Sequence, residues 1–299
     1  MESFNKIIKE IASELDIKVT LLSDNWLTVL EKNNKIKYIQ GYKFPLNDHA
    51  IGNILDDKGL FYDLMKLKEF PIIYHKVIFK NYDHDDILKF FNDNNQEIVV
   101  KGNIGTCGSE VFLVNNIDDL FPTIDNLLDK QFSISLCPYY DIINEYRVIL
   151  LNNEARIVYG KQRPIVIGDG KTSLHDLLIK FNPYYYQNPN HLKDIINYIP
   201  ELNEKVTINW QFNLSKGATL FTDISEELKK KITKLAQDIT KTLNITFASV
   251  DIIKTTDNKL LVMEANSGVM TKSLVNLIPN GYDLAKNIYK DALNLMFQE

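Results

Sequence analysis

Apolar residues recur along the chain at two spacings, and these predict a mixture of helices and strands. Apolar positions three or four residues apart predict helices over residues 4–15, 226–243 and 282–297. Further helices are expected after Lys58 and over residues 85–91. Short apolar runs between turn residues predict strands over residues 18–22, 26–31, 36–40, 72–79, 97–101 and 110–114.

This order of elements predicts an α+β or α/β fold divided into lobes. We expect a small N-terminal lobe over residues 1–56, a second lobe over residues 57–135 and a larger one over residues 136–299. Hydrophobic residues make up 45% and charged residues 24% of the chain, as in ordinary folded proteins.

Composition and charge narrow the classes of function. A net charge of −5 argues against a nucleic-acid partner, because proteins that bind nucleic acids are usually basic. The two cysteines and five histidines lack zinc-site spacing, and we interpret most of the histidines as surface or loop residues. The N-terminus is charged from residue 2, and no apolar run reaches the roughly 20 residues of a membrane span. The sequence therefore predicts a cytoplasmic protein that does not enter a membrane.

The most informative segment is residues 247–266, where two strand-like runs flank turn residues 257–258. A two-residue hairpin turn at that point makes Asp251 oppose Glu264, and side-chain alternation puts Asn266 on the face of Glu264. Opposed carboxylates repel each other, and both end apolar runs, so the pair needs a cation or a shared proton. Two carboxylates and an amide oxygen are hard ligands that suit Mg²⁺, with phosphate oxygens completing its coordination.

Two other interpretations of this hairpin remain open. Its acids face water if the hairpin is exposed, although the apolar run before Glu264 argues for burial. A hydrolase that uses the two carboxylates as acid and base is the second alternative. Asn266 favours the metal site over the hydrolase.

A lysine and three glycines follow one of the predicted strands. Lys101 ends the strand, and the next residues, GNIGTCGSE, place glycines at 102, 105 and 108. Glycines let main-chain N–H groups approach a phosphate closely, and a lysine adds positive charge. The order differs from the GxxxxGK[ST] loop and from the GxGxxG fingerprint, and a glycine-rich hairpin turn gives the same pattern. Together with a magnesium hairpin, the segment indicates a nucleoside triphosphate.

These motifs together resemble the ATP-grasp superfamily of ligases. The resemblance is strongest to the ATP-grasp modules of cyanophycin synthetase and of bifunctional glutathione synthetases, and residues 264–275 also resemble the end of D-alanine–D-alanine ligase. The stretches that carry it are EYRVI at 145–149, IGDGKTSLHDLL at 167–178, NLSKGATLFTDIS at 213–225, VDII at 250–253 and MEANSG at 263–268. The resemblance implies an ATP-grasp fold, with a small N-terminal lobe, a lid lobe, a larger C-terminal lobe, and ATP between two sheets.

The resemblance also assigns roles to matching positions. It implies that ATP is bound by Lys58, Lys101, Gly102, Gly105, Gly108, Leu136, Cys137, Pro138, Tyr139 and Glu145. In this set Lys101 would reach the α- and β-phosphates, the glycine loop would close over the triphosphate, residues 136–139 would read adenine and Glu145 would contact the ribose. Lys58 is equally compatible with a solvated lysine at a helix start. Cys137 is interpreted as a buried hinge residue and not a nucleophile.

The catalytic roles follow in the same way. Arg163 would stabilise the γ-phosphate and an acyl-phosphate, and Asn213 would lie near the phosphates or the acceptor. The metal ligands implied are Asp251, Glu264 and Asn266, which would hold two Mg²⁺, or Mn²⁺, with Glu264 bridging. Substrate contacts are assigned to Arg147, Lys216, Ser267 and Ser273, although Arg147 is also compatible with a strand residue in an ion pair.

The implied reaction is carboxylate–amine ligation through an acyl-phosphate, with release of ADP and phosphate. The substrates would be small carboxylates and amines, a peptide or a group on a carrier protein, and homodimers are common in similar ligases. Glu110 stands where the glycine loop usually has glycine. This departure motivates an alternative, a non-catalytic nucleotide-binding regulatory protein with a degenerate site. A kinase that stops at a phosphorylated product is a third hypothesis.

Overall fold

The computed structural model describes residues 1–105, 110–181 and 197–298. The predicted residues Cys107, Gly108 and His191 lie outside this part of the chain, as does the tyrosine run 184–186. Helices and antiparallel sheets are mixed, which confirms the α+β prediction. Within the described residues, no helix combines the length and apolar character needed to cross a membrane.

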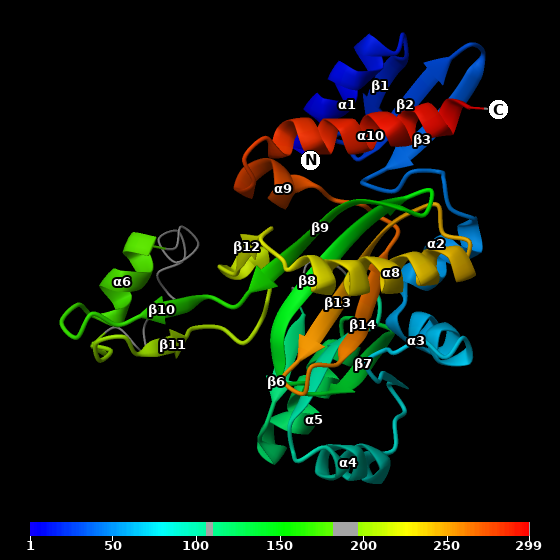
Figure 1. Cartoon of the computed structure of the whole chain (residues 1–299). Coiled ribbons are helices and arrows are strands. Elements are labelled where there is room, and N and C mark those ends of the chain that lie inside the picture. The colour runs from blue at the N-terminus through cyan, green and yellow to red at the C-terminus, as the bar shows by residue number, and fades with distance from the viewer. Residues whose placement is uncertain (106–109, 182–196, 299) are drawn as a thin grey trace.

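The N-terminal segment forms a helix and a three-stranded sheet. Helix α1 (Glu2–Glu14) packs with strands β1 (Lys18–Leu22), β2 (Leu27–Lys32) and β3 (Lys35–Gln40), which pair in the order β1-β2-β3. Helices α9 (Lys272–Leu277) and α10 (Gly281–Phe297) lie against this unit, although they come from the other end of the chain (Figure 1). One hydrophobic core therefore joins the two ends of the sequence. The lobe boundary at residue 56 stays a prediction.

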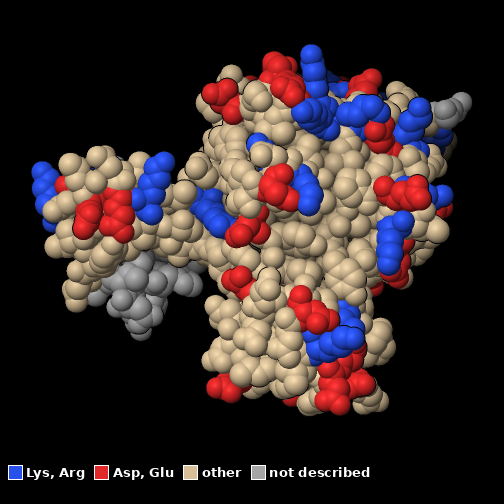
Figure 2. All heavy atoms as spheres, turned by 60° about the horizontal axis from the view of Figure 1, so that its bottom comes forward, with Lys and Arg blue, Asp and Glu red and all other residues tan. Residues whose placement is uncertain are grey.

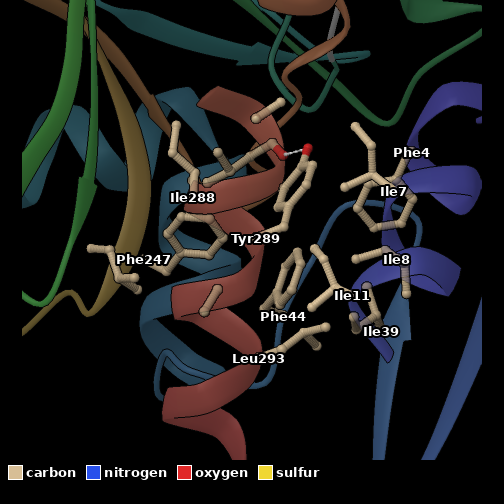
Figure 3. Close-up of a cluster of buried hydrophobic side chains, with 14 of the residues drawn as sticks. Phe4, Ile7, Ile8, Ile11, Ile39, Phe44, Phe247, Ile288, Tyr289 and Leu293 are labelled. Carbon is tan, nitrogen blue, oxygen red and sulfur yellow. Dashed lines mark hydrogen bonds between the residues drawn. The ribbon is translucent and has the colours of Figure 1, made fainter. Parts of the chain in front are cut away.

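Tyr289 of α10 stands at the centre of this core (Figure 3). Its ring stacks on Phe44, with ring centroids 5.6 Å apart, and meets the edge of Phe4 at 5.0 Å. Its hydroxyl donates to the Val269 carbonyl at 2.8 Å and accepts from the Thr271 main-chain N–H at 3.2 Å. The tyrosine thus ties the segment after the predicted metal hairpin to α10.

Replacing Tyr289 with phenylalanine is expected to lower the free energy of unfolding by about 1–3 kcal/mol. The ring packing is kept, but the Val269 carbonyl loses its donor in a buried position. Urea unfolding measures the change. Tyr282→Phe is the matched control, because its partner Glu10 reaches water, and it should cost less than about 1 kcal/mol. Equal losses in the two variants would contradict the argument.

After the N-terminal unit, the second part of the fold is a small sheet covered by two helices. Its strands pair in the order β4-β7-β5-β6, and all neighbours are antiparallel. These strands are β4 (Lys76–Phe79), β5 (Ile98–Gly102), β6 (Val111–Val114) and β7 (Ser133–Pro138). Helices α4 (His84–Asp93) and α5 (Ile117–Leu128) cover one face with a separate apolar core. The predicted strand 72–79 was wrong in its first half, because only its last four residues pair with β7.

The third part of the fold is a five-stranded sheet, the large sheet, whose strands lie in the order β12-β9-β8-β13-β14. Its strands are β8 (Ile142–Leu151), β9 (Glu154–Gln162), β12 (Thr219–Phe221), β13 (Phe247–Thr255) and β14 (Leu260–Asn266). Helices α2 (His49–Asp56), α3 (Lys58–Leu67) and α8 (Glu226–Thr242) bury one face of this sheet. Side chains alternate along a strand. Tyr146 and Val148 of β8 therefore join the core under the helices, while Glu145 and Arg147 face the opposite side.

The opposite face of the large sheet has apolar ends and a charged middle. At one end Ile149 and Leu151 belong to the core of the N-terminal unit. At the other end Ile253 packs with Ile73, which is hydrogen-bonded to β14, and with Cys137 of the small sheet. The charged residues of β8, β9 and β13 lie between these apolar clusters. This arrangement positions the candidate site between the two sheets.

A two-stranded arm stands away from the body of the molecule (Figures 1 and 2). It contains β10 (Ile165–Ile167), β11 (Lys205–Thr207) and α6 (Leu174–Phe181). The motif IGDGKTS begins on it. Asp169 accepts main-chain hydrogen bonds from Lys171 and Thr172, and a Cβ at Gly168 would lie 2.1 Å from the Glu201 carbonyl. The glycine is required for this close approach. On the face shown in Figure 2, acidic and basic side chains are interspersed.

Candidate active site

The β13–β14 hairpin brings Asp251 opposite Glu264, as predicted, but by a different route. The turn is one residue longer than predicted, because the main chain of Thr255 pairs with Lys259 around residues 256–258. Near the turn Ile252 therefore pairs with Val262 and not with Met263. A β-bulge at Met263 inserts the extra residue and restores the predicted register at the carboxylates.

Asp251 is fully buried and lies in a network of charged side chains. Arg147 donates to both carboxylate oxygens, from Nε to Oδ1 at 2.6 Å and from Nη2 to Oδ2. Lys161 of β9 lies 3.7 Å from Asp251 Oδ1 and pairs closely with Glu145. Burial alone would raise the pKa of Asp251, but Arg147 and Lys161 hold it below its ordinary value. Asp251 is therefore ionised at neutral pH.

Glu145 lies in the same network, but its pKa is shifted in the opposite direction to that of Asp251. It is 6% exposed, and burial raises its pKa above the ordinary value despite the attraction of Lys161. Its ion pair with Lys161 fixes the carboxylate between β8 and β9. The structure thus places the predicted ribose contact inside the buried network. The ribose role remains a prediction.

The donor set of the hairpin fits a hard divalent cation. Glu264 and Asn266 are half-buried, and Asn266 Nδ2 donates to Glu264 Oε1 at 3.2 Å. Among the described residues, no three His, Cys, Asp or Glu side chains converge on one point. The set is therefore two carboxylates and one amide, which needs further oxygen ligands such as phosphates to bind Mg²⁺. Asp251 keeps acceptor capacity beside Arg147, because a carboxylate offers about four lone-pair positions.

Lys101 on the small sheet and Lys58 at the start of α3 add positive charge close to this hairpin. Lys101 is on β5 and is 7% exposed. Lys58 begins α3, and its Nζ donates to the main-chain carbonyls of Asn103 at 3.3 Å and Gly105 at 3.2 Å. Burial lowers the pKa of Lys58, Glu264 opposes this effect and Lys101 adds to it. Both lysines thus lie within electrostatic reach of one another, and Lys58 also feels the Glu264 carboxylate.

The local structure around Lys58 is fixed by two polar side chains that the sequence analysis did not single out. Asp57 caps α3 by accepting from the Leu60 N–H at 2.9 Å. Asn103 is buried, donates to Asp57 Oδ2 at 2.9 Å and accepts from the Gly59 N–H at 3.0 Å. This pair connects the start of the glycine loop to the start of α3. An N-cap aspartate before Lys58 was a signal in the sequence, but its partner Asn103 was not.

The described part of the glycine loop contains Gly102 and Gly105. A Cβ at Gly102 would lie 2.4 Å from Gln131 Oε1, so the end of the Gln131 side chain would have to move to accommodate any other residue. Glu110 comes directly before β6, and its carboxylate accepts a close hydrogen bond from Gln131 Nε2. The Glu110 carboxylate is therefore directed at Gln131.

The predicted adenine hinge is the end of β7. Leu136 and Cys137 are buried, while Pro138 and Tyr139 are partly exposed. Burial raises the pKa of the Cys137 thiol, which agrees with its interpretation as an unreactive residue. Adenine binding by this hinge stays a prediction.

Arg163 follows β9 and approaches the hinge. Its Nη2 donates to the Tyr139 hydroxyl at 3.1 Å, and the guanidinium stacks over the Phe212 ring at 4.9 Å. Its Nε is buried and has no hydrogen-bond partner among the described residues. The arginine is thus held at two points and has a donor left for an acidic group.

The remaining predicted residues lie around this centre. Asn213 caps a short 3-10 helix, η2 (Leu214–Lys216), by accepting from the Ser215 N–H at 2.9 Å. Burial lowers the pKa of Lys216. Ser267 is buried and donates to Asp56 at 3.1 Å, while Ser273 is half-buried on α9. The structure brings Arg147, Asp251 and Glu264 together, but the described contacts of Asn213 and Ser267 are structural.

Two buried residues of the site were missed from the sequence. Lys161 is an isolated lysine in an apolar strand, and its partners Glu145 and Asp251 become apparent only from strand order. His75 is 4% exposed, so it is not one of the histidines at the surface. Its Nδ1 lies 2.7 Å from Ser135 Oγ.

Comparisons with known proteins agree with this arrangement. Residues 204–291 match the RimK-like ATP-grasp domain. No curated protein matches the sequence. Among solved structures, a bifunctional glutathione synthetase from Pasteurella multocida is similar, with a TM-score of 0.59 and 17% identity. The match covers 98% of this chain and 44% of the synthetase, so the chain spans less than half of that protein.

Two amino-acid ligases are also similar in structure. A D-alanine–D-alanine ligase from Bacillus anthracis, solved in complex with ATP, has a TM-score of 0.56 at 15% identity, over 81% of this chain and 65% of the ligase. The VanG D-Ala:D-Ser ligase from Enterococcus faecalis has a TM-score of 0.53 at 14% identity, over 81% of this chain and 62% of that one. At such identities the likeness is one of fold. The chain therefore has the α+β ATP-grasp fold that its sequence motifs predicted.

Proposed function

We propose that this chain is an ATP-dependent carboxylate–amine ligase that works through an acyl-phosphate. The observation that carries the proposal is the meeting of opposite charges between the two sheets. Asp251, Glu264 and Asn266 supply oxygen ligands on the large sheet, while Lys101 on the small sheet and Lys58 at the start of α3 supply positive charge. Phosphoryl transfer needs positioning and charge neutralisation more than a protein nucleophile.

The proposed reaction has two steps. An oxygen of the substrate carboxylate attacks the γ-phosphorus, the bond from that phosphorus to the β–γ bridging oxygen breaks, and ADP leaves. The amine then attacks the acyl carbon, loses a proton and displaces phosphate to give the amide. In this proposal Arg163, whose buried Nε has no hydrogen-bond partner among the described residues, would hold the transferred phosphoryl oxygens.

Lys58 and Lys101 bind and orient the triphosphate in this scheme. Asp251, Glu264 and Asn266 would hold Mg²⁺, two ions by the predicted ligand set, or Mn²⁺ in its place. When bound, the metal would neutralise phosphate oxygens during transfer. Arg147 and Lys161 keep Asp251 ionised, so the carboxylate is ready as a ligand at neutral pH. The buried ion pairs also exclude water from this side of the site.

ADP release tests the proposal. The chain is supplied with ATP and Mg²⁺ and with pools of amino acids, small carboxylates, amines and peptides. We expect sustained ADP release only when both a carboxylate and an amine are present, because the amine is needed to consume the acyl-phosphate. ADP release with a stable phosphorylated product and no amide would instead identify a kinase. Binding of ATP without formation of ADP in any pool would contradict the proposed catalytic activity.

The alternative of a non-catalytic nucleotide-binding protein rests on Glu110. Because Gln131 already holds the Glu110 carboxylate, we expect Glu110→Gly to change the affinity for ATP by less than about threefold. Calorimetric titration with ATP measures it. Gln131→Leu, which frees the carboxylate, should weaken ATP binding by about threefold or more. A gain of about tenfold in Glu110→Gly would favour the degenerate site.

A further inference from the structure

His75 lies where the chain crosses from one sheet to the other. Residues 71–73 run beside β14, where Val262 donates to the Pro71 carbonyl at 2.8 Å and its own carbonyl accepts from the Ile73 N–H at 3.0 Å. One residue after His75 the chain enters β4, in which Val77 pairs with Ser135. The predicted strand 72–79 is thus split between two sheets, and His75 occupies the junction.

The ring of His75 contacts both sides of this junction. On the small sheet its Nδ1 lies 2.7 Å from Ser135 Oγ, and Ser135 is fully buried opposite Lys101. On the large sheet the ring lies beside the main chain of Met263, the extra residue of the β14 bulge. Met263 directly precedes Glu264. One imidazole therefore connects the strand pair that holds Lys101 to the residue beside the predicted metal ligand.

A neutral imidazole suits these two contacts, because it has one donor and one acceptor. Burial, Lys101 and Lys58 all lower the pKa of His75, well below its ordinary value. The ring therefore adds no positive charge beside the two lysines. A leucine of similar size would keep the packing but leave Ser135 and the Met263 main chain without this partner.

We propose that His75 is a positioning residue, which fixes the spacing between Lys101 of the small sheet and Glu264 of the large sheet. The inference rests on the proposed function, since the spacing matters when one triphosphate contacts both sheets. In this role His75 contacts neither a lysine nor a predicted metal ligand directly. His75 acts through Ser135 and Met263.

Calorimetric titration of ATP with and without Mg²⁺ tests the role. In EDTA Lys58 and Lys101 bind the triphosphate without a metal bridge to Glu264, so His75→Leu should change ATP affinity by less than about threefold. In the presence of Mg²⁺, which must join Glu264 to the phosphates, His75→Leu should weaken ATP binding by about tenfold. His75→Asn, which keeps a polar atom near the position of Nδ1, should recover about threefold of this loss.

Ser135→Ala is the second variant, because it removes the same hydrogen bond from the other side and disturbs packing less. Ser135→Ala should also weaken ATP binding only when Mg²⁺ is present. Thermal unfolding is the control that each variant is folded. An equal loss with and without Mg²⁺, or no loss in either variant, would overturn the positioning role. Absence of ATP binding by the unmodified chain would instead overturn the proposed function, and this inference with it.

Discussion

Replacing Glu264 with glutamine is expected to slow ADP release by about a hundredfold or more. The amide keeps the size of the side chain and its contact with Asn266, but it removes the negative charge. A neutral amide oxygen is a weaker ligand for a hard cation, and Lys58 loses the carboxylate that opposes the effect of its burial. Initial rates with ATP, Mg²⁺ and a productive carboxylate–amine pair measure the effect.

Glu227→Gln is the matched control for this prediction. Glu227 lies on the exposed surface of α8 and pairs with Lys231 at 2.6 Å, far from the hairpin in sequence and outside the charged network. Its rate should stay within about twofold of the unmodified chain. A Glu264→Gln protein that folds normally and keeps about a third or more of the rate of the unmodified chain would show that the hairpin carboxylate does not serve the chemistry.

Replacing Arg147 with leucine is expected to lower the free energy of unfolding by about 3–5 kcal/mol. Asp251 is fully buried, and the substitution removes both hydrogen bonds that its carboxylate receives from Arg147. Lys161 at 3.7 Å remains, but it is already paired with Glu145. Urea unfolding at neutral pH gives the loss. Lys18→Leu breaks an exposed pair with Glu31 and should cost less than about 1 kcal/mol.

The pH dependence of this loss identifies its cause. In the unmodified chain the pKa of Asp251 is below its ordinary value of 3.8, so its stabilising contribution is full above that value and is lost as the pH falls through the lowered pKa. Without Arg147, burial acts with less opposition and raises the pKa of Asp251. The penalty of Arg147→Leu should therefore shrink as the pH falls, because the variant protonates Asp251 first. A penalty that does not vary with pH would point to lost packing.

The opposed carboxylates were predictable from sequence, but the way the chain achieves them was not. Side-chain alternation and an assumed two-residue turn placed Asp251 opposite Glu264, and this pairing holds because the bulge at Met263 offsets the extra turn residue. The longer turn and the bulge at Met263 depend on contacts from elsewhere. Residues 71–73 pair with the outer side of Val262, and the ring of His75 contacts Met263. No local pattern in the hairpin encodes these partners.

Strand order explains the residues that sequence reasoning missed. Lys161, Glu145 and Asp251 come from β9, β8 and β13, which are adjacent only in the folded sheet. Lys161 was missed because no local pattern in the sequence pairs it with Glu145 or Asp251, which were predicted from their own motifs. The split of residues 72–79 is of the same kind, because one apolar run pairs first with β14 and then with β7. The ATP-grasp fold itself was predictable, because its motifs are local stretches of sequence.

Hydroxylamine trapping tests the central claim most directly, because it detects the acyl-phosphate whatever the natural amine is. The chain is incubated with ATP, Mg²⁺, hydroxylamine and pools of amino acids, small carboxylates and peptides, with Glu264→Gln alongside. The account predicts a hydroxamate from at least one pool, with stoichiometric ADP, that is nearly absent with Glu264→Gln. ADP formation without hydroxamate, or hydroxamate that persists in Glu264→Gln, would contradict carboxylate activation at this site.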